Sequence, residues 1–406
     1  MSLNDVPSAE RIHIGVFGVR NAGKSSLVNA MANQQVSVVS EIAGTTTDPV
    51  RKAMELLPLG PVLLIDTPGF DDEGKLGEQR VARARETLRR ADLALLVVDA
   101  CKGLDLPDLE LQRLLDASSV PYVIAYSKAD ALSPAERANI DAGLGAHEVV
   151  VSALTGEGVE ELKEMLAHRM EGAKSERRLI SDLLEPGDLV VLVTPIDESA
   201  PKGRMILPQQ MAMRDILEAH TTFVCCQPQE LELALKSLSA PPRIVVTDSQ
   251  AFGFVADVVP PEVQLTSFSI LMARYKGNLA QLVEGAAALD GLCDGSRVLM
   301  AEGCTHHRQC ADIGTVKIPN WIRSFTGVEP LFETSSGLGF PDYLSGYDLI
   351  VHCGGCTLNE REMEHRLREA RRAGVPIVNY GVAIAHMNGI LKRSLQPFPQ
   401  VASLLR

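Results

Sequence analysis

Cysteine and histidine residues gather at two places in the last third of the chain. One group contains Cys304 and His306, and the other contains His352, Cys353 and Cys356, with Cys-x-x-Cys spacing. Each group follows an apolar run that predicts a buried strand. Open α/β sheets place their chemistry at the carboxyl ends of strands, so parallel neighbouring strands would bring both groups to one edge. These residue types predict a pocket of three thiolates and nearby imidazoles, which suits a soft metal.

The three thiolates are compatible with two kinds of metal site. A closed structural zinc site takes four side chains, and His306 or His352 could complete it. A [4Fe–4S] cluster held by three cysteines would instead keep one iron with an exchangeable ligand. The spacing favours neither. A third interpretation, a redox Cys-x-x-Cys, is weaker because that motif usually opens a helix in a thioredoxin-like unit and needs no distant Cys304.

A phosphate-binding motif lies near the N-terminus. Residues 18–25 match G-x-x-x-x-G-K-[ST] between a short β-rich run and a helical stretch. The backbone amides of such a loop cradle phosphate at a helix N-terminus. Lys24 would reach the β- and γ-phosphate oxygens, and Ser25 would hold Mg²⁺.

Two further segments complete the expected phosphate site. Asp66 ends an apolar run and is followed by Thr-Pro-Gly, so it would bind the metal through water, and the Gly69 amide would contact the γ-phosphate. Thr45 and Thr46 lie in a polar loop in which a threonine, expected to be Thr46, can coordinate Mg²⁺. A loop that orders on the γ-phosphate and relaxes after hydrolysis is a switch.

The choice of base is predicted by a motif after the next buried run. Asp130, two residues after Lys128, can accept hydrogen bonds from guanine N1–H and N2–H₂. Ser152 and Ala153 would supply backbone contacts to the base oxygen. The order and spacing of these motifs resemble the translation-factor class of small GTPases. Ser127 departs from that pattern, because the class usually has asparagine there, and this predicts weaker nucleotide binding.

The hydrolytic machinery differs from that of many GTPases. Phe70 stands where many carry a water-positioning glutamine. Asn21, with the threonine-rich loop, resembles the potassium-activated subgroup, in which K⁺ replaces an arginine finger, although an asparagine here could simply cap the loop. Lys24, Asn21, Thr46 and Gly69 are the residues expected to act in hydrolysis. The predicted nucleotide site comprises Gly18, Asn21, Ala22, Gly23, Lys24, Ser25, Ser26, Thr45, Thr46, Asp66, Gly69, Lys128, Asp130, Ser152 and Ala153.

The pattern of predicted elements indicates an α/β protein of three domains. We expect a GTP-binding domain with a P-loop sheet over residues 1–173, a small βαβ dimerisation domain over 178–264 and a doubly wound cluster-binding domain over 265–406. The middle domain has three β-rich runs, and its exposed sheet edges predict a homodimer. The last domain is expected to begin with a strand near 266–271.

Composition excludes some classes of function. The net charge of −13 and the lack of a basic run argue against nucleic acid as a partner. No apolar run approaches the roughly 20 residues of a membrane-spanning helix, and no signal peptide is visible, so we expect a cytoplasmic protein. Disulfides are then not expected. Of the cysteines outside the three proposed ligands, Cys101, Cys225, Cys226 and Cys293 are predicted to be buried in the core, and Cys310, a spare thiol near the pocket, is predicted to be structural.

A GTPase motif set, a small α/β segment and a Cys-x-His … His-Cys-x-x-Cys segment together resemble the FeFe-hydrogenase maturation GTPases, the HydF family, over almost the whole chain. The resemblance implies that Cys304, Cys353 and Cys356 ligate a [4Fe–4S] cluster, with His306 or His352 as a possible fourth ligand. It implies a scaffold that receives a di-iron precursor from the radical-SAM maturases HydE and HydG and delivers it to the hydrogenase catalytic subunit. The alternative is a potassium-type GTPase of tRNA modification or ribosome assembly with structural zinc.

Overall fold

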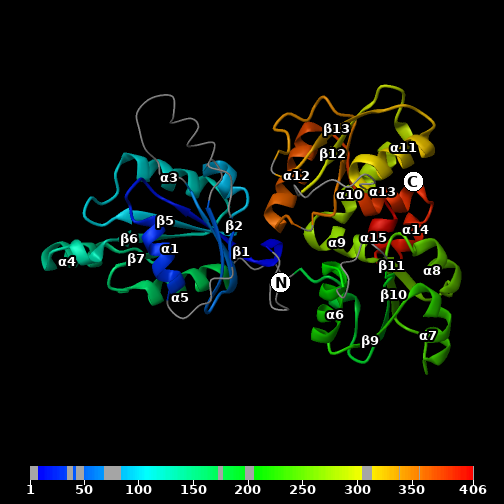
Figure 1. Ribbon diagram of the computed structural model, residues 1–406, viewed down its shortest axis with the longest axis horizontal. Coiled ribbons are helices and arrows are strands. Elements are labelled where there is room, and N and C mark those ends of the chain that lie inside the picture. The colour runs from blue at the N-terminus through cyan, green and yellow to red at the C-terminus, as the bar shows by residue number, and fades with distance from the viewer. Residues whose placement is uncertain are drawn as a thin grey trace. The chain divides into compact units, whose positions relative to one another are not determined.

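The computed structural model describes residues 8–33, 40–42, 50–67, 84–171, 177–196, 205–303, 313–337, 339–355 and 357–405. The chain divides into two compact units, Met1–Ser175 and Glu176–Arg406 (Figure 1). Within the described residues there is one sheet in the first unit and two in the second. The predicted α/β class with three sheets is therefore confirmed, while the residue boundaries of three domains stay a prediction.

The first unit is built on a seven-stranded sheet of order β2-β3-β4-β1-β5-β6-β7. Strands β1 and β4–β7 run parallel, and β2 and β3 are antiparallel to their neighbours. The strands are β1 (Ile12–Phe17), β2 (Ser40–Ile42), β3 (Val50–Leu56), β4 (Gly60–Asp66), β5 (Leu93–Asp99), β6 (Tyr122–Ser127) and β7 (Glu148–Val150). Helices α1 (Lys24–Asn33), α3 (Leu106–Ala117), α4 (Pro134–Gly143) and α5 (Val159–Glu171) connect them.

Helices cover both faces of this sheet (Figure 1). Strand β5 is buried along its whole length, as expected for a strand covered on both sides. Alternate residues of β5 belong to two separate apolar clusters, one with α1 and α5 and the other with α3. This layering exposes the carboxyl ends of the parallel strands along one edge, where the loops after β1, β4 and β6 begin.

The second unit contains two parallel four-stranded sheets, of order β11-β10-β8-β9 and β13-β12-β14-β15. The strands are β8 (Leu189–Val193), β9 (Thr222–Cys226), β10 (Ile244–Thr247), β11 (Gln264–Ser267), β12 (Arg297–Ala301), β13 (Leu331–Ser335), β14 (Leu349–His352) and β15 (Ile377–Asn379). The helices are α6 (Leu207–Glu218), α7 (Leu231–Ser237), α8 (Phe252–Val258), α9 (Phe268–Lys276), α10 (Leu279–Ala286), α11 (Ile318–Thr326), α12 (Glu360–Ala373), α13 (Tyr380–Met387), α14 (Leu391–Ser394) and α15 (Pro399–Ala402).

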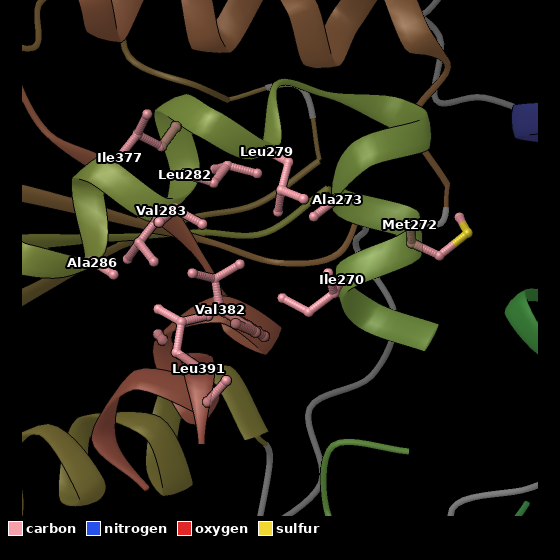
Figure 2. Close-up of a cluster of buried hydrophobic side chains, with 14 of the residues drawn as sticks. Ile270, Met272, Ala273, Leu279, Leu282, Val283, Ala286, Ile377, Val382 and Leu391 are labelled. Atoms are coloured by element: carbon pink, nitrogen blue, oxygen red, sulfur yellow. The ribbon is translucent and has the colours of Figure 1, made fainter. Parts of the chain in front are cut away.

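One apolar cluster joins the two sheets of this unit. It includes residues of both sheets and of the helices between them, among them Ile270 on α9, Val283 on α10 and Val382 on α13 (Figure 2). Helix α10 lies so close to β15 that a Cβ atom at Gly285 would stand 2.0 Å from the Ile377 carbonyl oxygen. The close packing explains why the second unit is a single compact body.

The predicted strand near 266–271 is wrong. Strand β11 ends at Ser267 and pairs with β10, so it completes the middle sheet, which has four strands among the described residues and not the three expected. The Ser267 hydroxyl accepts a hydrogen bond from the Ile270 amide at 3.3 Å and caps α9. Serine is a preferred N-cap, and this cap turns an apolar run that resembled a strand into a buried helix.

Among the described ranges, no helix has both the length and the apolar composition that crossing a bilayer requires.

Candidate functional site

The phosphate loop connects β1 to α1. Gly18 has a φ of +144°, and a Cβ atom there would lie 2.3 Å from the Val97 carbonyl oxygen, so only glycine fits. Gly23 also has a positive φ, of +93°. The Lys24 side chain is buried, and its Nζ donates to the carbonyl oxygens of Gly18 and Val19, both at 2.9 Å. The loop thus has the compact backbone and the buried ammonium group that phosphate binding requires.

Ser25 and Asp66 form the expected Mg²⁺ position. The Ser25 hydroxyl donates to Asp66 Oδ2 at 2.9 Å. The other oxygen, Asp66 Oδ1, is buried and has no hydrogen-bond partner within the described part of the chain. Burial raises the pKa of Asp66, against the opposing effects of Ser25 and Lys24. A hydrated divalent cation would satisfy this carboxylate, so the donor set fits Mg²⁺. Thr45, Thr46 and Gly69 lie outside the described residues.

The base-recognition loops follow β6 and β7. The Ser152 hydroxyl donates to Asp130 Oδ1 at 2.5 Å, and this fixes the carboxylate that is expected to bind guanine. The Thr155 amide in turn donates to Ser152 Oγ at 3.1 Å. Ala153 follows in the same turn, after the fully buried Ser152. The side chain of Ser152, predicted only for backbone contacts, therefore also orients Asp130.

Asp99 is a site residue that the sequence analysis missed. It ends the apolar strand β5, and its Oδ2 accepts from Lys128 Nζ at 2.6 Å. Burial alone would raise the pKa of Asp99, but Lys128 and the Cys101 amide lower it below its usual value. A carboxylate directly after a fully apolar run, at the same sheet edge as the other loops, is the signal that could have identified it.

Ser127, which replaces the usual asparagine, connects two of these loops. Its Oγ lies in hydrogen-bond contact with the Ala22 carbonyl oxygen of the phosphate loop and 3.0 Å from that of Val98. A hydroxyl has one proton and donates to only one of them at a time. The serine therefore keeps a link between the base loop and the phosphate loop. Weaker nucleotide binding stays a prediction.

Asn21 and Ser26 are exposed residues of the phosphate loop and the first turn of α1. Asn21 has a φ of +60°, a left-handed conformation that asparagine adopts more readily than most residues. This conformation is one reason for the residue type, and a role for Asn21 in binding K⁺ stays a prediction.

The second candidate site lies at the carboxyl ends of β12 and β14. These strands are parallel neighbours, with Ala301 opposite His352, as the sequence predicted. Cys353 Sγ accepts hydrogen bonds from the Gly303 amide at 3.0 Å and the Gly355 amide at 3.4 Å. Amide donors favour an anionic sulfur, so Cys353 is suited to bind a metal as a thiolate.

Comparison with known families identifies the second unit. The model of the hydrogen maturase F tetramerization domain matches residues 280–397, and that of the hydrogen maturase F dimerization domain matches residues 179–277. The 50S ribosome-binding GTPase family matches residues 13–128. The chain belongs to the HydF family. It is a P-loop GTPase, and the two HydF domains imply a homo-oligomer.

Curated tRNA modification GTPases resemble part of the chain. The tRNA modification GTPase MnmE of Legionella pneumophila (strain Corby) is 38% identical over 163 residues, which cover 39% of this chain and 34% of that protein. MnmE of Aquifex aeolicus is 33% identical over 168 residues, or 41% of this chain and 36% of that protein. The chain thus spans about a third of the length of these relatives.

Two solved structures also resemble part of the chain. A single-residue variant of Aquifex aeolicus Era bound to GDP·AlF₄⁻ is 22% identical, with a TM-score of 0.33, and the match covers 58% of this chain and 91% of that one. The G domain of the T. maritima FeoB iron transporter is 27% identical, with a TM-score of 0.30, over 39% of this chain and 99% of that one.

In this HydF-family chain, the loops that carry the cysteines are held together closely. The Thr357 hydroxyl donates to the Gly303 carbonyl oxygen at 2.9 Å. Gly355 has a φ of +64°, and a Cβ atom there would lie 2.8 Å from Met363 Sδ. Three of the predicted ligands lie outside the described residues: Cys304, His306 and Cys356. In the sequence, the first two follow Gly303 within three positions, and the third directly follows Gly355.

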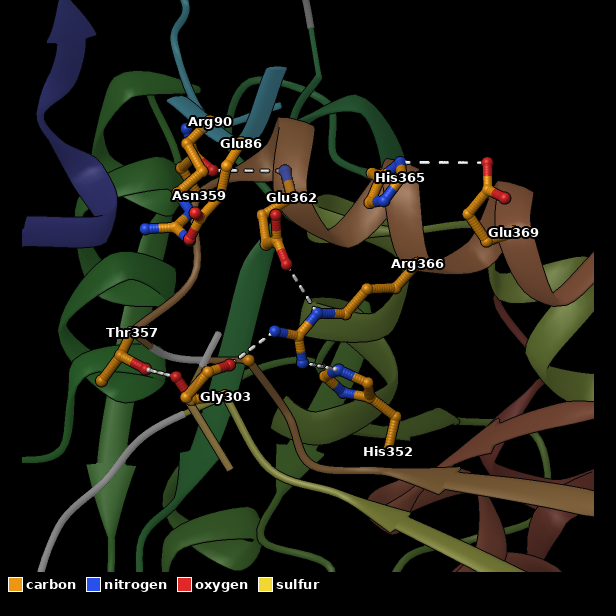
Figure 3. Close-up of polar contacts among 12 residues, drawn as sticks. Glu86, Arg90, Gly303, His352, Thr357, Asn359, Glu362, His365, Arg366 and Glu369 are labelled. Carbon is orange, nitrogen blue, oxygen red and sulfur yellow. Dashed lines mark hydrogen bonds and ion pairs between the residues drawn. The ribbon is translucent and has the colours of Figure 1, made fainter. Parts of the chain in front are cut away.

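His352 is fully buried, and both of its ring nitrogens have partners. Nδ1 lies 2.6 Å from the Cys353 carbonyl oxygen, and Nε2 lies 3.0 Å from Arg366 Nη1 (Figure 3). Burial, followed by the charge of Arg366, lowers the pKa of His352 to about 3, so the ring is neutral. The sequence analysis missed Arg366 and Glu362. Their i,i+4 spacing on a predicted helix was visible, but the buried face of that helix was not.

The prediction that the other cysteines are core residues is wrong for most of them. Cys101, Cys225 and Cys293 are exposed, and Cys226 is half-buried. Cys101 and Cys293 lie in turns, and Cys225 is on the edge strand β9, which has little cover. Burial raises the pKa of Cys226 to about 11.

Proposed function

We propose that the chain is a GTP-hydrolysing scaffold that binds a [4Fe–4S] cluster through Cys304, Cys353 and Cys356. In this role it assembles the di-iron subcluster precursor and delivers it to apo FeFe-hydrogenase. The observation that carries the proposal is the environment of Cys353, whose sulfur accepts two backbone amides at the carboxyl edge of a parallel sheet. Membership of the HydF family supports the same reading of this sheet.

The geometry around Cys353 suits a cluster ligand. Hydrogen bonds to a ligating sulfur stabilise its negative charge and are one of the main ways in which a protein tunes a cluster. When held by three thiolates, a [4Fe–4S] cluster offers one iron position that a non-cysteine ligand can occupy and exchange. Gly303 and Gly355, whose amides reach the sulfur, also pack tightly, because a Cβ atom at either position would lie within 3.0 Å of Leu358 or Met363.

In the first unit, we propose that the P-loop amides and Lys24 bind the phosphates of GTP, while Ser25 and Thr46 coordinate Mg²⁺. Asp66 would hold the metal through water, and Gly69 would contact the γ-phosphate. Asp130 would select guanine. Hydrolysis would proceed by in-line attack of water, with K⁺ near Asn21 neutralising developing charge. Because Phe70 stands in place of a water-positioning glutamine and the motifs show no arginine finger, unassisted turnover is expected to stay below the roughly 5–20 s⁻¹ of assisted GTPases.

The proposed partners follow from this function. They are the hydrogenase catalytic subunit, the radical-SAM maturases HydE and HydG and a second copy of the chain, in the cytoplasm. The acidic composition and the absence of a basic run disfavour nucleic acid as a partner.

The test is anaerobic reconstitution with iron and sulfide, followed by metal counting and EPR of the reduced protein. The wild type should hold four irons and give a [4Fe–4S] signal, and Cys304→Ser, Cys353→Ser and Cys356→Ser should each lose it. Cys293→Ser is the matched control, since Cys293 is exposed and precedes β12 at the opposite end of that strand. One tightly bound zinc and no iron would refute the cluster and favour a structural-zinc GTPase.

A further inference from the structure

A buried polar network is built around Arg366 (Figure 3) and reaches Cys353 through the neighbouring His352. It consists of His352 at the end of β14 and Glu362 and Arg366 on α12. The three side chains are almost fully buried. Arg366 donates through Nε to Glu362 Oε1 at 2.9 Å, through Nη1 to His352 Nε2 at 3.0 Å and through Nη2 to the Gly337 carbonyl oxygen at 2.6 Å. The guanidinium group therefore stands between the glutamate and the histidine.

The partners of His352 determine which nitrogen carries the proton. A guanidinium group can only donate hydrogen bonds, so Nε2 must accept from Arg366 through its lone pair. The proton of the neutral ring is then on Nδ1, which donates to the Cys353 carbonyl oxygen. With one nitrogen donating and the other accepting, neither is left to coordinate iron.

The network fixes the backbone of Cys353 from one side, and the sheet fixes it from the other. The Cys353 amide donates to the Ala301 carbonyl oxygen at 2.9 Å, while its own carbonyl accepts from His352. The sulfur accepts the amides of Gly303 and Gly355. Every polar group of Cys353 thus has a partner, and a ligand held in this way needs little rearrangement to bind metal.

We infer that Glu362, Arg366 and His352 form a positioning relay for the cluster site, in which His352 is a hydrogen-bond donor to Cys353 and not an iron ligand. The inference rests on the proposed function and makes it more specific. Glu362 neutralises and orients Arg366, Arg366 fixes the tautomer of His352, and His352 holds the loop of Cys353. The fourth iron position is then filled by a group other than His352.

Nitrogen hyperfine coupling tests whether His352 is a ligand. Protein labelled with ¹⁵N-histidine is reconstituted with iron and sulfide in imidazole-free buffer, reduced and measured by pulsed EPR. The inference predicts either no directly bound histidine nitrogen or a coupling that His352→Gln retains. A coupling that is lost in His352→Gln overturns it, and so does one that persists when His306 and the adjacent His307 are both replaced by glutamine. The variant with glutamine at both 306 and 307 leaves the relay intact and decides the question even if His352 variants do not fold.

Iron retention tests the positioning role. Glutamine at position 352 keeps one donor and one acceptor, whereas leucine has neither. His352→Leu and Arg366→Gln should release iron to a chelator about 10- to 100-fold faster than wild type, the usual effect of losing a partner of a metal ligand. His352→Gln should be closer to wild type than to His352→Leu. Fluorescence of Trp321, the only tryptophan in the chain, checks that the second unit of each variant is folded.

Two outcomes of the retention experiment would overturn the relay. One is equal iron release by all variants and the wild type, and the other is a glutamine variant as impaired as the leucine variant. A wild-type protein that takes up no iron would refute the proposed function itself. That result is distinguishable, because it is seen before any variant is compared.

Discussion

Replacing Arg366 by methionine should strongly destabilise the second unit. The guanidinium group is fully buried, and its partner Glu362 has a side chain only 7% exposed, so the substitution leaves a buried carboxylate without its cation. His352 Nε2 and the Gly337 carbonyl oxygen also lose their donor. Removing one partner of a buried ion pair costs about 3–5 kcal/mol. We therefore expect the free energy of unfolding of this unit to fall by about that amount.

The chain provides its own probe and a matched control for this experiment. Trp321 lies in the second unit, so its fluorescence during urea unfolding reports on that unit alone. Arg214 on α6 forms an ion pair with Glu218 at the same i,i+4 spacing, but both side chains are exposed. Arg214→Met should cost less than about 0.5 kcal/mol, as exposed helical pairs do. All variants are compared at one protein concentration, because assembly also changes apparent stability.

A double-mutant cycle makes the reasoning refutable. Glu362→Leu combined with Arg366→Met removes both charges, so it should recover part of the loss, since an apolar pair avoids the desolvation cost of the ions. The account fails if Arg366→Met costs no more than Arg214→Met. It also fails if the double variant shows the simple sum of two large single effects, since the pair would then not interact.

Three further predictions concern other parts of the chain. Asp99→Asn removes the carboxylate that holds Lys128, so the binding free energy of GDP should fall by about 1 kcal/mol, which is about fivefold in affinity. A titration with fluorescent GDP measures this change, and an unchanged affinity would refute the role of Asp99. Burial and the neighbouring Asp105 raise the pKa of Asp108 to about 6. A carboxyl group whose pKa is raised in the folded state stabilises that state at low pH, and this contribution is lost as the pH rises. Asp108 should therefore make the first unit lose stability from pH 4 to 7, and Asp108→Asn should reduce this dependence of the unfolding temperature on pH. The same dependence in wild type and variant would contradict the raised pKa of Asp108. Gly285→Ala places a Cβ atom against β15 and should cost at least about 1–3 kcal/mol in the Trp321 unfolding assay, whereas a neutral effect would show that α10 can move away.

Much of the site could be predicted because its motifs carry local physical requirements. The phosphate loop needs glycine at position 18 for close approach and an ammonium group at position 24, and both appear in a fixed spacing after a strand. The sequence also indicated that the two groups would meet if their strands were parallel neighbours, and β12 and β14 are paired in that way.

The features that were missed depend on contacts between distant residues. The run after residue 266 has the composition of a strand, and only the cap at Ser267 and the burial of α9 decide that it becomes a helix. Arg366 lies on a helix rich in charges, and although Met363 and Leu367 mark its apolar face, the sequence does not show that this face turns toward His352. The exposure of Cys225 follows from the position of β9 at a sheet edge, which a single strand pattern does not reveal.

Activation of apo FeFe-hydrogenase shows whether the cysteine site of this chain carries the di-iron precursor. The chain is loaded anaerobically in the presence of HydE and HydG, separated from them and added to apo FeFe-hydrogenase, and hydrogen evolution is measured. The account predicts activation by the wild type and by Cys293→Ser, and none by Cys353→Ser. Activation by Cys353→Ser at the level of the wild type would contradict the claim that this thiolate site carries the precursor.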